Sequence, residues 1–150
     1  MSKRHAAHRD IARFLVIMLA FGLPGSVVKA STLSVSDGWY RLMPPGSERS
    51  AGYLQLENRG PGDSVIVAVR SPQLDKVEIH SHSMKDGVMR MRKLDRFDVP
   101  AGEQRAFRPG GYHLMLFGLP PGLVEGASLD FELLLEDGAV VPFTAVARKP

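Results

Sequence analysis

Short apolar and alternating runs follow one another from residue 39 to residue 147, separated by clusters rich in proline, glycine and acidic residues. Runs of this length are typical of β-strands joined by turns, and no stretch keeps the 3.6-residue apolar period of an amphipathic helix. Strands so closely spaced predict an all-β fold, a single-domain sandwich or Greek-key barrel without internal repeats. The predicted strands are Trp39–Leu42, Gly52–Glu57, Ser64–Val69, Lys76–Ser83, Val88–Lys93, Gln104–Phe107, Tyr112–Gly118, Leu129–Leu135 and Val140–Ala147.

The first 30 residues follow a different pattern. A basic start, "MSKRHAAHRDIAR", precedes the apolar run "FLVIMLAFGL", and Val28-Lys29-Ala30 places small residues where a signal peptidase reads them. The apolar run is shorter than the ~20 residues that cross a bilayer. No cysteine follows it for a lipid anchor. The sequence therefore predicts a secretory signal peptide over residues 1–30, cleaved near Ala30, and an exported domain over residues 31–150 without stable membrane insertion.

Removing the predicted signal peptide changes the charge of the protein. Residues 1–30 hold five of the 19 Lys and Arg residues and one of the 16 Asp and Glu residues, so the remaining domain has 14 basic and 15 acidic residues. The sequence pI of about 9.4 thus reflects the leading segment. A domain with a formal net charge of −1 gives no support for nucleic-acid binding.

Histidine and methionine residues are concentrated in one part of the predicted domain. All three histidines after residue 30, and four of the five methionines, lie between residues 80 and 115, and the chain contains no cysteine. Thiols in an oxidising export compartment tend to form disulfides, whereas thioethers offer soft sulfur that selects Cu(I). The lack of cysteine also excludes a disulfide framework, a c-type haem attachment, a cysteine zinc site and a blue-copper centre.

An Asp86-Gly87 pair within "MKDGVM" predicts a two-residue hairpin turn. That turn would pair Met84 with Met89 and His82 with Met91, and would leave His80 diagonally opposite Met91. Because side chains alternate along strands, these two imidazoles and three thioethers would project from one face. The opposite face, which carries Val77, Ile79 and Val88, is predicted to be the core side.

A further strand brings His113 into an otherwise apolar run, "YHLMLFG". Alternation places His113, Met115 and Phe117 on one face, and Tyr112, Leu114 and Leu116 on the other. Taken singly, Met89 or Met115 would be core packing and His113 a hydrogen-bonded interior histidine. The joint pattern favours a soft metal site, provided that this strand packs beside the hairpin.

Ten residues separate His80 from Met91, 21 separate Met91 from His113, and one separates His113 from Met115. This H-x10-M-x21-H-x-M spacing resembles the signature of the periplasmic copper chaperones of the PCuAC type. The flanking segments "DGWYRLMPPG", "AGYLQLENRG", "VEIHSHSMKDGVMRM" and "RPGGYHLMLFGL" are similar to that family too. The resemblance extends from about Val35 to Val146.

The resemblance implies a cupredoxin-like β-sandwich that binds Cu(I) through His80, Met91, His113 and Met115. It also implies a non-enzymatic, periplasmic role in delivering copper to cytochrome c oxidase, through the CuA centre of subunit II or a copper-assembly thiol protein. Accessory ligand candidates are His82, Met84 and Met89. Where many relatives have methionine, this chain has His82, which would compete as a ligand or favour Cu(II).

Two supporting features are predicted around this site. A ligating histidine usually donates its second nitrogen to a carboxylate or carbonyl, and Glu78 or Asp86 could accept that bond. The loop Lys85–Gly87 and the loop before His113 would give copper access from solvent.

The sequence also bears on three other functions. A hydrolase is disfavoured because there is no G-x-S-x-G elbow and the histidines all lie in the methionine cluster. A copper-dependent redox enzyme stays open, since His and Met also ligate redox copper. A secreted β-sandwich that binds another protein, with the methionines as core, is the third function. Zinc is disfavoured because its usual protein ligands are Cys, His and carboxylates.

Overall fold

The computed structural model describes residues 31–149, so the predicted signal peptide lies outside the described residues. The described residues form ten β-strands and no helix, and this confirms the prediction of a single all-β domain. The strands are β1 (Leu33–Arg41), β2 (Arg49–Asn58), β3 (Ser64–Arg70), β4 (Lys76–Lys85), β5 (Val88–Leu94), β6 (Phe97–Val99), β7 (Gln104–Phe107), β8 (Tyr112–Phe117), β9 (Ser128–Leu135) and β10 (Val140–Arg148).

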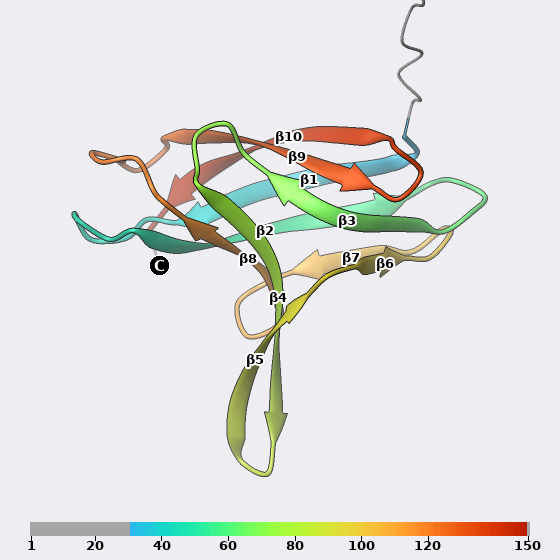
Figure 1. Cartoon of the computed structure of the whole chain (residues 1–150), viewed down its shortest axis with the longest axis horizontal. Helices are drawn as coiled ribbons and strands as arrows, with labels where there is room; N and C mark the ends of the chain where they lie inside the picture. The colour runs from blue at the N-terminus through green and yellow to red at the C-terminus, as the bar shows by residue number, and fades with distance from the viewer. Residues whose placement is uncertain (1–30, 150) are drawn as a thin grey trace, which may run out of the picture.

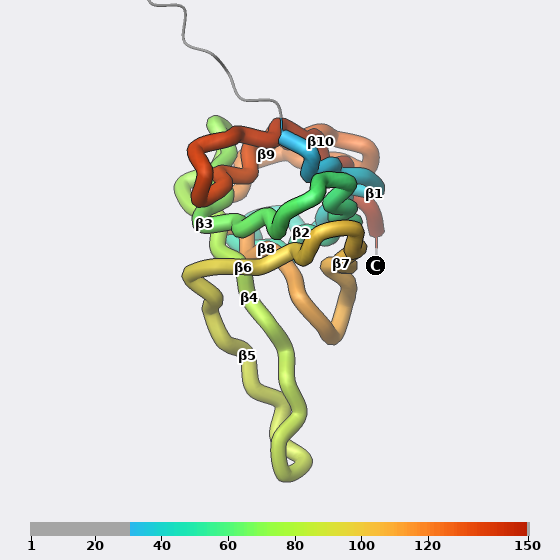
Figure 2. The backbone as a smooth tube through the Cα atoms, turned by 90° about the vertical axis from the view of Figure 1, so that its right-hand side faces the viewer, coloured from blue at the N-terminus to red at the C-terminus, as the bar shows by residue number. Residues whose placement is uncertain are grey.

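The ten strands belong to one sheet with the order β5-β4-β8-β7-β2-β1-β10-β9-β3-β6, and β8 also pairs with β2. Most pairs are antiparallel, but β1 runs parallel to β10 and β7 parallel to β8. The sheet folds over on itself, so that β9 and β10 lie on one side of the body and β6 and β7 on the other (Figures 1 and 2). Strand β8 therefore stands at a junction, with β4 on one edge and β2 on the other.

A single apolar core lies between the two sides of the folded sheet. Many of its most buried side chains come from β2, β8 and β9, at every second residue, as strand alternation requires. In β3 a register shift between Ile66 and Ala68 separates the two buried residues, Ile66 and Val69, by three positions. Each fully buried leucine or phenylalanine stabilises the fold by roughly 1.5–3 kcal/mol relative to exposure. The largest are Tyr40, Leu54, Leu56, Ile66, Leu114, Leu116, Leu129, Phe131 and Leu133.

The hairpin of β4 and β5 projects from this body (Figures 1 and 2). The inner part of β4, Lys76 to Ser81, pairs with β8, whereas its outer part pairs only with β5. The outer residues are correspondingly exposed, and exposure reaches 70% at Met84 and 61% at Met89. The hairpin thus joins the core at its base and extends into solvent at its tip.

Several predicted boundaries were wrong. Strand β1 begins at Leu33 rather than Trp39, because its register with β2 shifts between Ser36 and Trp39 and interrupts the alternation that marks a strand. Strand β6 was missed, since only three residues pair there and Pro100 follows at once. Val88 was predicted on the core side, but it is 54% exposed because the projecting hairpin has no core beneath it.

Candidate metal centre

The predicted histidine–methionine hairpin is present with the predicted register. His82 lies opposite Met91, and Met84 lies opposite Met89. Asp86 and Gly87 have φ angles of 54° and 73°, the left-handed conformation that both central residues of a type I′ turn require. Asp86 therefore occupies the turn at the tip, which leaves Glu78 as the carboxylate near the base.

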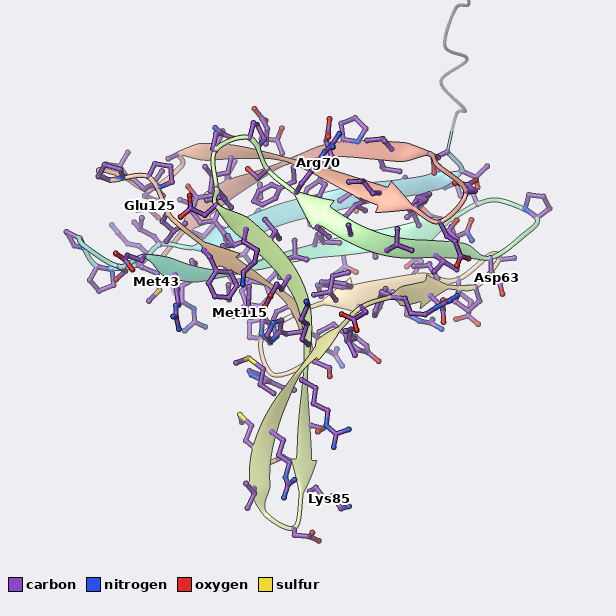
Figure 3. All side chains as sticks on the ribbon, viewed as in Figure 1. Met43, Asp63, Arg70, Lys85, Met115 and Glu125 are labelled. Atoms are coloured by element: carbon purple, nitrogen blue, oxygen red, sulfur yellow. The ribbon has the colours of Figure 1, made fainter. Side chains whose placement is uncertain are left out.

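Strand β8 lies beside β4 and brings the remaining donors to the same face. His113 is directly opposite His80, and Met115 is opposite Glu78. Leu114 and the other inward residues of β8 enter the core, whereas His113 and Met115 alternate onto the outer face of the sheet. The structure therefore supplies the strand neighbour that the sequence could not specify. Figure 3 shows Met115 on the body, near the base of the projecting hairpin, with Lys85 at the tip.

The imidazole of His80 is oriented by a carboxylate. Its Nε2 lies 2.9 Å from Oε2 of Glu78. This nitrogen is therefore protonated and donates a hydrogen bond to the carboxylate. The bond to His80, followed by that to Lys76, lowers the pKa of Glu78 against the opposing effect of burial. The other nitrogen, Nδ1, keeps a lone pair, is shielded from solvent and has no hydrogen-bond partner among the described residues.

The imidazole of His113 is oriented by a backbone carbonyl. It is 3% exposed, and its Nδ1 donates a hydrogen bond of 3.2 Å to the oxygen of Gly111. Burial lowers the pKa of His113; the bond to Gly111 acts in the opposite direction, and the neighbouring His82 and His80 lower the pKa further. The ring is thus kept neutral with Nε2 as the lone-pair nitrogen, the form in which histidine binds a metal.

A third imidazole, His82, lies closer to His113 than His80 does. The ring centroids are 4.6 Å apart for His82 and His113, and 5.8 Å apart for His80 and His113. The Nδ1 atom of His82 is also buried and has no hydrogen-bond partner within residues 31–149. Buried polar atoms without partners are rare and cost about 1–3 kcal/mol each. The cluster therefore contains two buried imidazole nitrogens that no group among residues 31–149 engages.

A groove on this face contains most of the predicted donors and one that the sequence left out. Its lining includes His82, Met91, His113 and Met115, together with Met43 from the segment after β1. Met43 is the one methionine after residue 30 that lies outside the cluster of residues 80–115, and 36 residues separate it from His80. The pairing of β1, β2 and β8 brings the end of β1, next to Met43, to the groove. Only its residue type could have indicated this role. His80 is not among the residues that line the groove.

The other accessory candidates, Met84 and Met89, lie elsewhere. They form a cross-strand pair beyond His82 and Met91, near the exposed tip, and neither lines the groove. Within residues 31–149 no group of three or more His, Cys, Asp or Glu residues is arranged to hold a metal ion. A metal bound at this cluster would therefore need thioether sulfur from Met91 or Met115.

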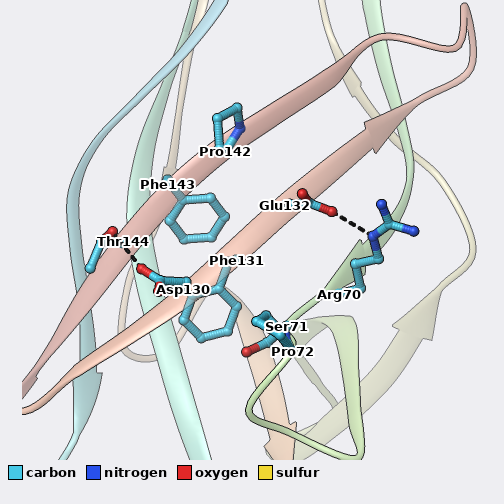
Figure 4. A pocket seen from close by; sticks show the side chains of 9 residues that line it. All are labelled: Arg70, Ser71, Pro72, Asp130, Phe131, Glu132, Pro142, Phe143 and Thr144. Carbon is cyan, nitrogen blue, oxygen red and sulfur yellow. Dashed lines mark hydrogen bonds and ion pairs between the residues drawn. The ribbon is translucent and has the colours of Figure 1, made fainter.

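A second hollow lies over β9 and β10 and has a different character (Figure 4). Its polar side chains are already paired: Arg70 bonds Glu132 at 2.6 Å, and Thr144 donates to Asp130 at 2.9 Å. The rings of Phe131 and Phe143 stack with a centroid distance of 5.0 Å. This lining contains neither histidine nor methionine, so this hollow offers no soft donor for a metal.

Comparisons with known proteins agree with the fold. A family model described as "Putative lipoprotein LpqE-like" matches residues 33–147. "Putative lipoprotein Lxx21020" of Leifsonia xyli subsp. xyli (strain CTCB07) is 30% identical over 115 residues, which is 76% of this chain and 68% of that protein. No helix among residues 31–149 is long and apolar enough to span a membrane.

Two solved structures show the same architecture. The "Copper-bound PCuAC domain from PmoF2" matches with a TM-score of 0.67 and 19% identity over 81% of this chain and 97% of that one. The "Solution structure of CuI-DR1885 from Deinococcus Radiodurans" matches with a TM-score of 0.56 and 23% identity over 87% and 82% of the two chains. The sequence resemblance to PCuAC-type proteins is thereby confirmed, with a shared fold. The chain belongs to the LpqE-like family.

Proposed function

We propose that this protein is a copper chaperone that binds one Cu(I) ion through His80, Met91, His113 and Met115. The observation that carries the proposal is the state of the imidazoles: Glu78 and Gly111 each occupy one ring nitrogen, and the lone pair of the other is left free. Two thioethers lie on the same face, on strands either side of β4. Soft sulfur with imidazole is a donor set suited to copper.

The donor set fits transport better than catalysis. Two neutral imidazoles and two thioethers hold Cu(I) without adding charge. Met91 is 50% exposed at the base of the projecting hairpin, so an incoming ligand could displace it first. The copper ion would then pass to a partner by stepwise exchange of ligands. An open groove beside a solvent-facing thioether is the arrangement that such exchange requires.

The setting we propose is the periplasm, after export directed by residues 1–30. The recipient we propose is the CuA centre of cytochrome c oxidase subunit II, or a thiol protein that assembles it. Support comes from the resemblance to PCuAC-type chaperones and from two solved structures of similar fold, one copper-bound and one holding Cu(I).

The proposal is tested by copper retention and transfer. The purified protein, loaded with Cu(I) under anaerobic conditions, is challenged with a chromogenic Cu(I) chelator, and then with the copper-free CuA domain of subunit II. We expect one copper per chain to resist the chelator and to move to the acceptor domain. His113→Gln should retain far less copper, whereas Glu132→Gln, at the second hollow, should behave like the unaltered protein.

Two results would contradict the proposal in different ways. Loss of all Cu(I) to a weak chelator would favour a metal-free protein-interaction module. Sustained oxygen consumption with a reductant, together with retention of the copper, would favour a copper-dependent redox enzyme.

A further inference from the structure

We propose that the groove beside the hairpin is a docking surface for a copper-exchanging protein that carries carboxylates around its own metal site. The docking surface rests on the proposed copper-binding function and extends it from the metal to the partner. Its main residues are Arg41 and Arg49, which line the groove together with the copper donors.

The basic residues of the protein fall into two groups. Of the 14 lysines and arginines after residue 30, seven form ion pairs within residues 31–149, namely Arg59, Arg70, Lys76, Lys93, Arg96, Arg105 and Lys149. The other seven have no ion pair in the described part of the chain; they are Arg41, Arg49, Lys85, Arg90, Arg92, Arg108 and Arg148.

The unpaired basic residues gather around the copper donors. Besides Arg41 and Arg49 in the groove, Arg148 lies next to Arg41 in the pairing of β1 with β10. Arg108 directly precedes the loop residues that line the groove. Three more lie on the projecting hairpin, namely Lys85, Arg90 and Arg92. No aspartate or glutamate lines the groove. A positive surface therefore surrounds the centre of a domain that has 14 basic and 15 acidic residues.

These cations do not serve copper binding or the stability of the fold. Like charges repel, so a guanidinium beside the donors lowers the affinity of the groove for a copper ion. The Nε atom of Arg41 is shielded from solvent and has no hydrogen-bond partner among the described residues. Such an unsatisfied donor is a cost to the isolated protein. An anionic group from a partner would satisfy the arginines and neutralise the groove.

The geometry favours a protein carboxylate as that group. The planar fork of arginine can donate two parallel hydrogen bonds to a carboxylate. Arg49 is presented beside the Phe117 ring, whose centroid lies 5.5 Å from the guanidinium carbon. Met91 and Met115 line the same groove, so a loop that docks its carboxylates there also brings its metal ligands close to copper.

Other occupants fit less well. A flat membrane surface would meet the projecting tip of the hairpin before it reached the groove at the base (Figure 2). A second copy of this chain would present the same positive surface and be repelled. The hairpin cations Arg90 and Arg92 alternate with Met89 and Met91 and so lie on the other face of β5. They would add long-range attraction for an acidic partner rather than contacts within the groove.

The test measures the second-order rate constant of copper transfer from the Cu(I)-loaded protein to the copper-free CuA domain of subunit II. The groove variant is Arg41→Gln, Arg49→Gln. The matched control is Arg59→Gln, Arg70→Gln, which removes the same charge from two ion-paired arginines that do not line the groove. Each protein is measured at ionic strengths of about 0.01 M and about 0.15 M, between which the Debye length falls from about 30 Å to about 8 Å.

We expect the groove variant to transfer copper at least about tenfold more slowly than the unaltered protein at the lower ionic strength, since electrostatic steering raises association rates by about 10–10³. The rate of the unaltered protein should fall as salt is added, and that of the groove variant should change much less. The control should transfer copper at close to the unaltered rate. Circular dichroism and chelator competition establish that every variant keeps its strand content and its Cu(I).

Three results would overturn the docking surface. Equal rates and equal salt dependence in the groove variant and the control, with Cu(I) retained, would overturn it alone. Binding to phosphatidylglycerol vesicles that the groove variant loses, with unchanged copper transfer, would assign the arginines to an anionic membrane instead. Absence of transfer from a protein that retains Cu(I) would overturn it together with the recipient named above. Failure to retain Cu(I) would overturn the proposed function itself.

Discussion

His80 and His113 face each other across β4 and β8, and each is held by a different hydrogen-bond acceptor, the Glu78 carboxylate for His80 and the Gly111 carbonyl for His113. These acceptors determine which nitrogen of each ring is free. The copper binding that we propose therefore depends on groups that would not touch the metal.

Glu78→Gln should weaken copper binding through His80. The amide can present its NH2 group to Nε2 and so favour the wrong tautomer, and it lacks the charge that stabilises the imidazole N–H bond. Replacement of such a supporting group typically lowers metal affinity by about 10–100-fold. Competition with a Cu(I) chelator measures the effect. Glu132→Gln, which breaks an ion pair with Arg70 at the second hollow, is the control; an equal loss of affinity in both variants would contradict the role given to Glu78.

Substitution of Met91 and substitution of Met89 should have very different effects on Cu(I) affinity, although both residues lie on β5. Met91 lines the groove with His113, whereas Met89 is nearer the tip. Met→Leu conserves volume, so each change should cost less than about 1.5 kcal/mol in unfolding free energy. We expect Met91→Leu to reduce Cu(I) affinity at least about tenfold and Met89→Leu to leave it nearly unchanged. Both affinities are measured by the same chelator competition. A larger loss of Cu(I) affinity in Met89→Leu than in Met91→Leu would mean that copper binds near the tip of the hairpin.

The hairpin turn should influence copper binding without supplying a ligand. Gly87 has a φ of +73°, and a side chain there would be strained by about 1–2 kcal/mol. Gly87→Ala should therefore loosen the register that pairs His82 with Met91 and lower Cu(I) affinity.

The matched control for the turn is Gly138→Ala, in the turn between β9 and β10. Gly138 has a φ of +85°, and an added Cβ would meet no atom within 4 Å, as at Gly87. This variant should lose stability in thermal unfolding but keep its copper affinity. Equal copper affinities of the two glycine variants would show that the register of the hairpin does not matter for the centre.

The copper-free protein should become less stable in mild acid, in part through His113. The pKa of His113 in the folded protein is lowered from the 6.5 of the free side chain. Between the two pKa values the unfolded chain binds more protons than the folded one, so the unfolding free energy falls as pH decreases through that window and levels off below the folded pKa. Well above 6.5 the ring is neutral in both the folded and the unfolded chain, so this penalty vanishes. His113→Gln should show a shallower decline in urea unfolding; an unchanged pH profile would contradict this.

Much of the centre could be predicted from the sequence because its geometry is local. Strand alternation and the Asp86-Gly87 turn are short-range features, and together they set the partners of His82 and Met84. The proximity of β8 to β4 was not predictable, since periodicity does not specify neighbouring strands. Met43 was missed for the same reason.

The prediction that Val88 faces the core was wrong, although the residues around it in the sequence argue against a core face. Val88 shares its face with Arg90 and Arg92, and two arginines at alternate positions do not belong on a core face. The unpartnered nitrogen of His82 could be found only in the structure, because it depends on what surrounds the ring from three strands.

The most direct test of the account is X-ray absorption on the Cu(I)-loaded protein beside its Met91→Leu, Met115→Leu double variant, with copper counted per chain. We predict about one copper per chain, with nitrogen and sulfur scatterers in the unaltered protein and loss of the sulfur contribution in the variant. Retention of Cu(I) with only nitrogen or oxygen neighbours, or a sulfur signal that persists without both methionines, would contradict the His–Met copper centre.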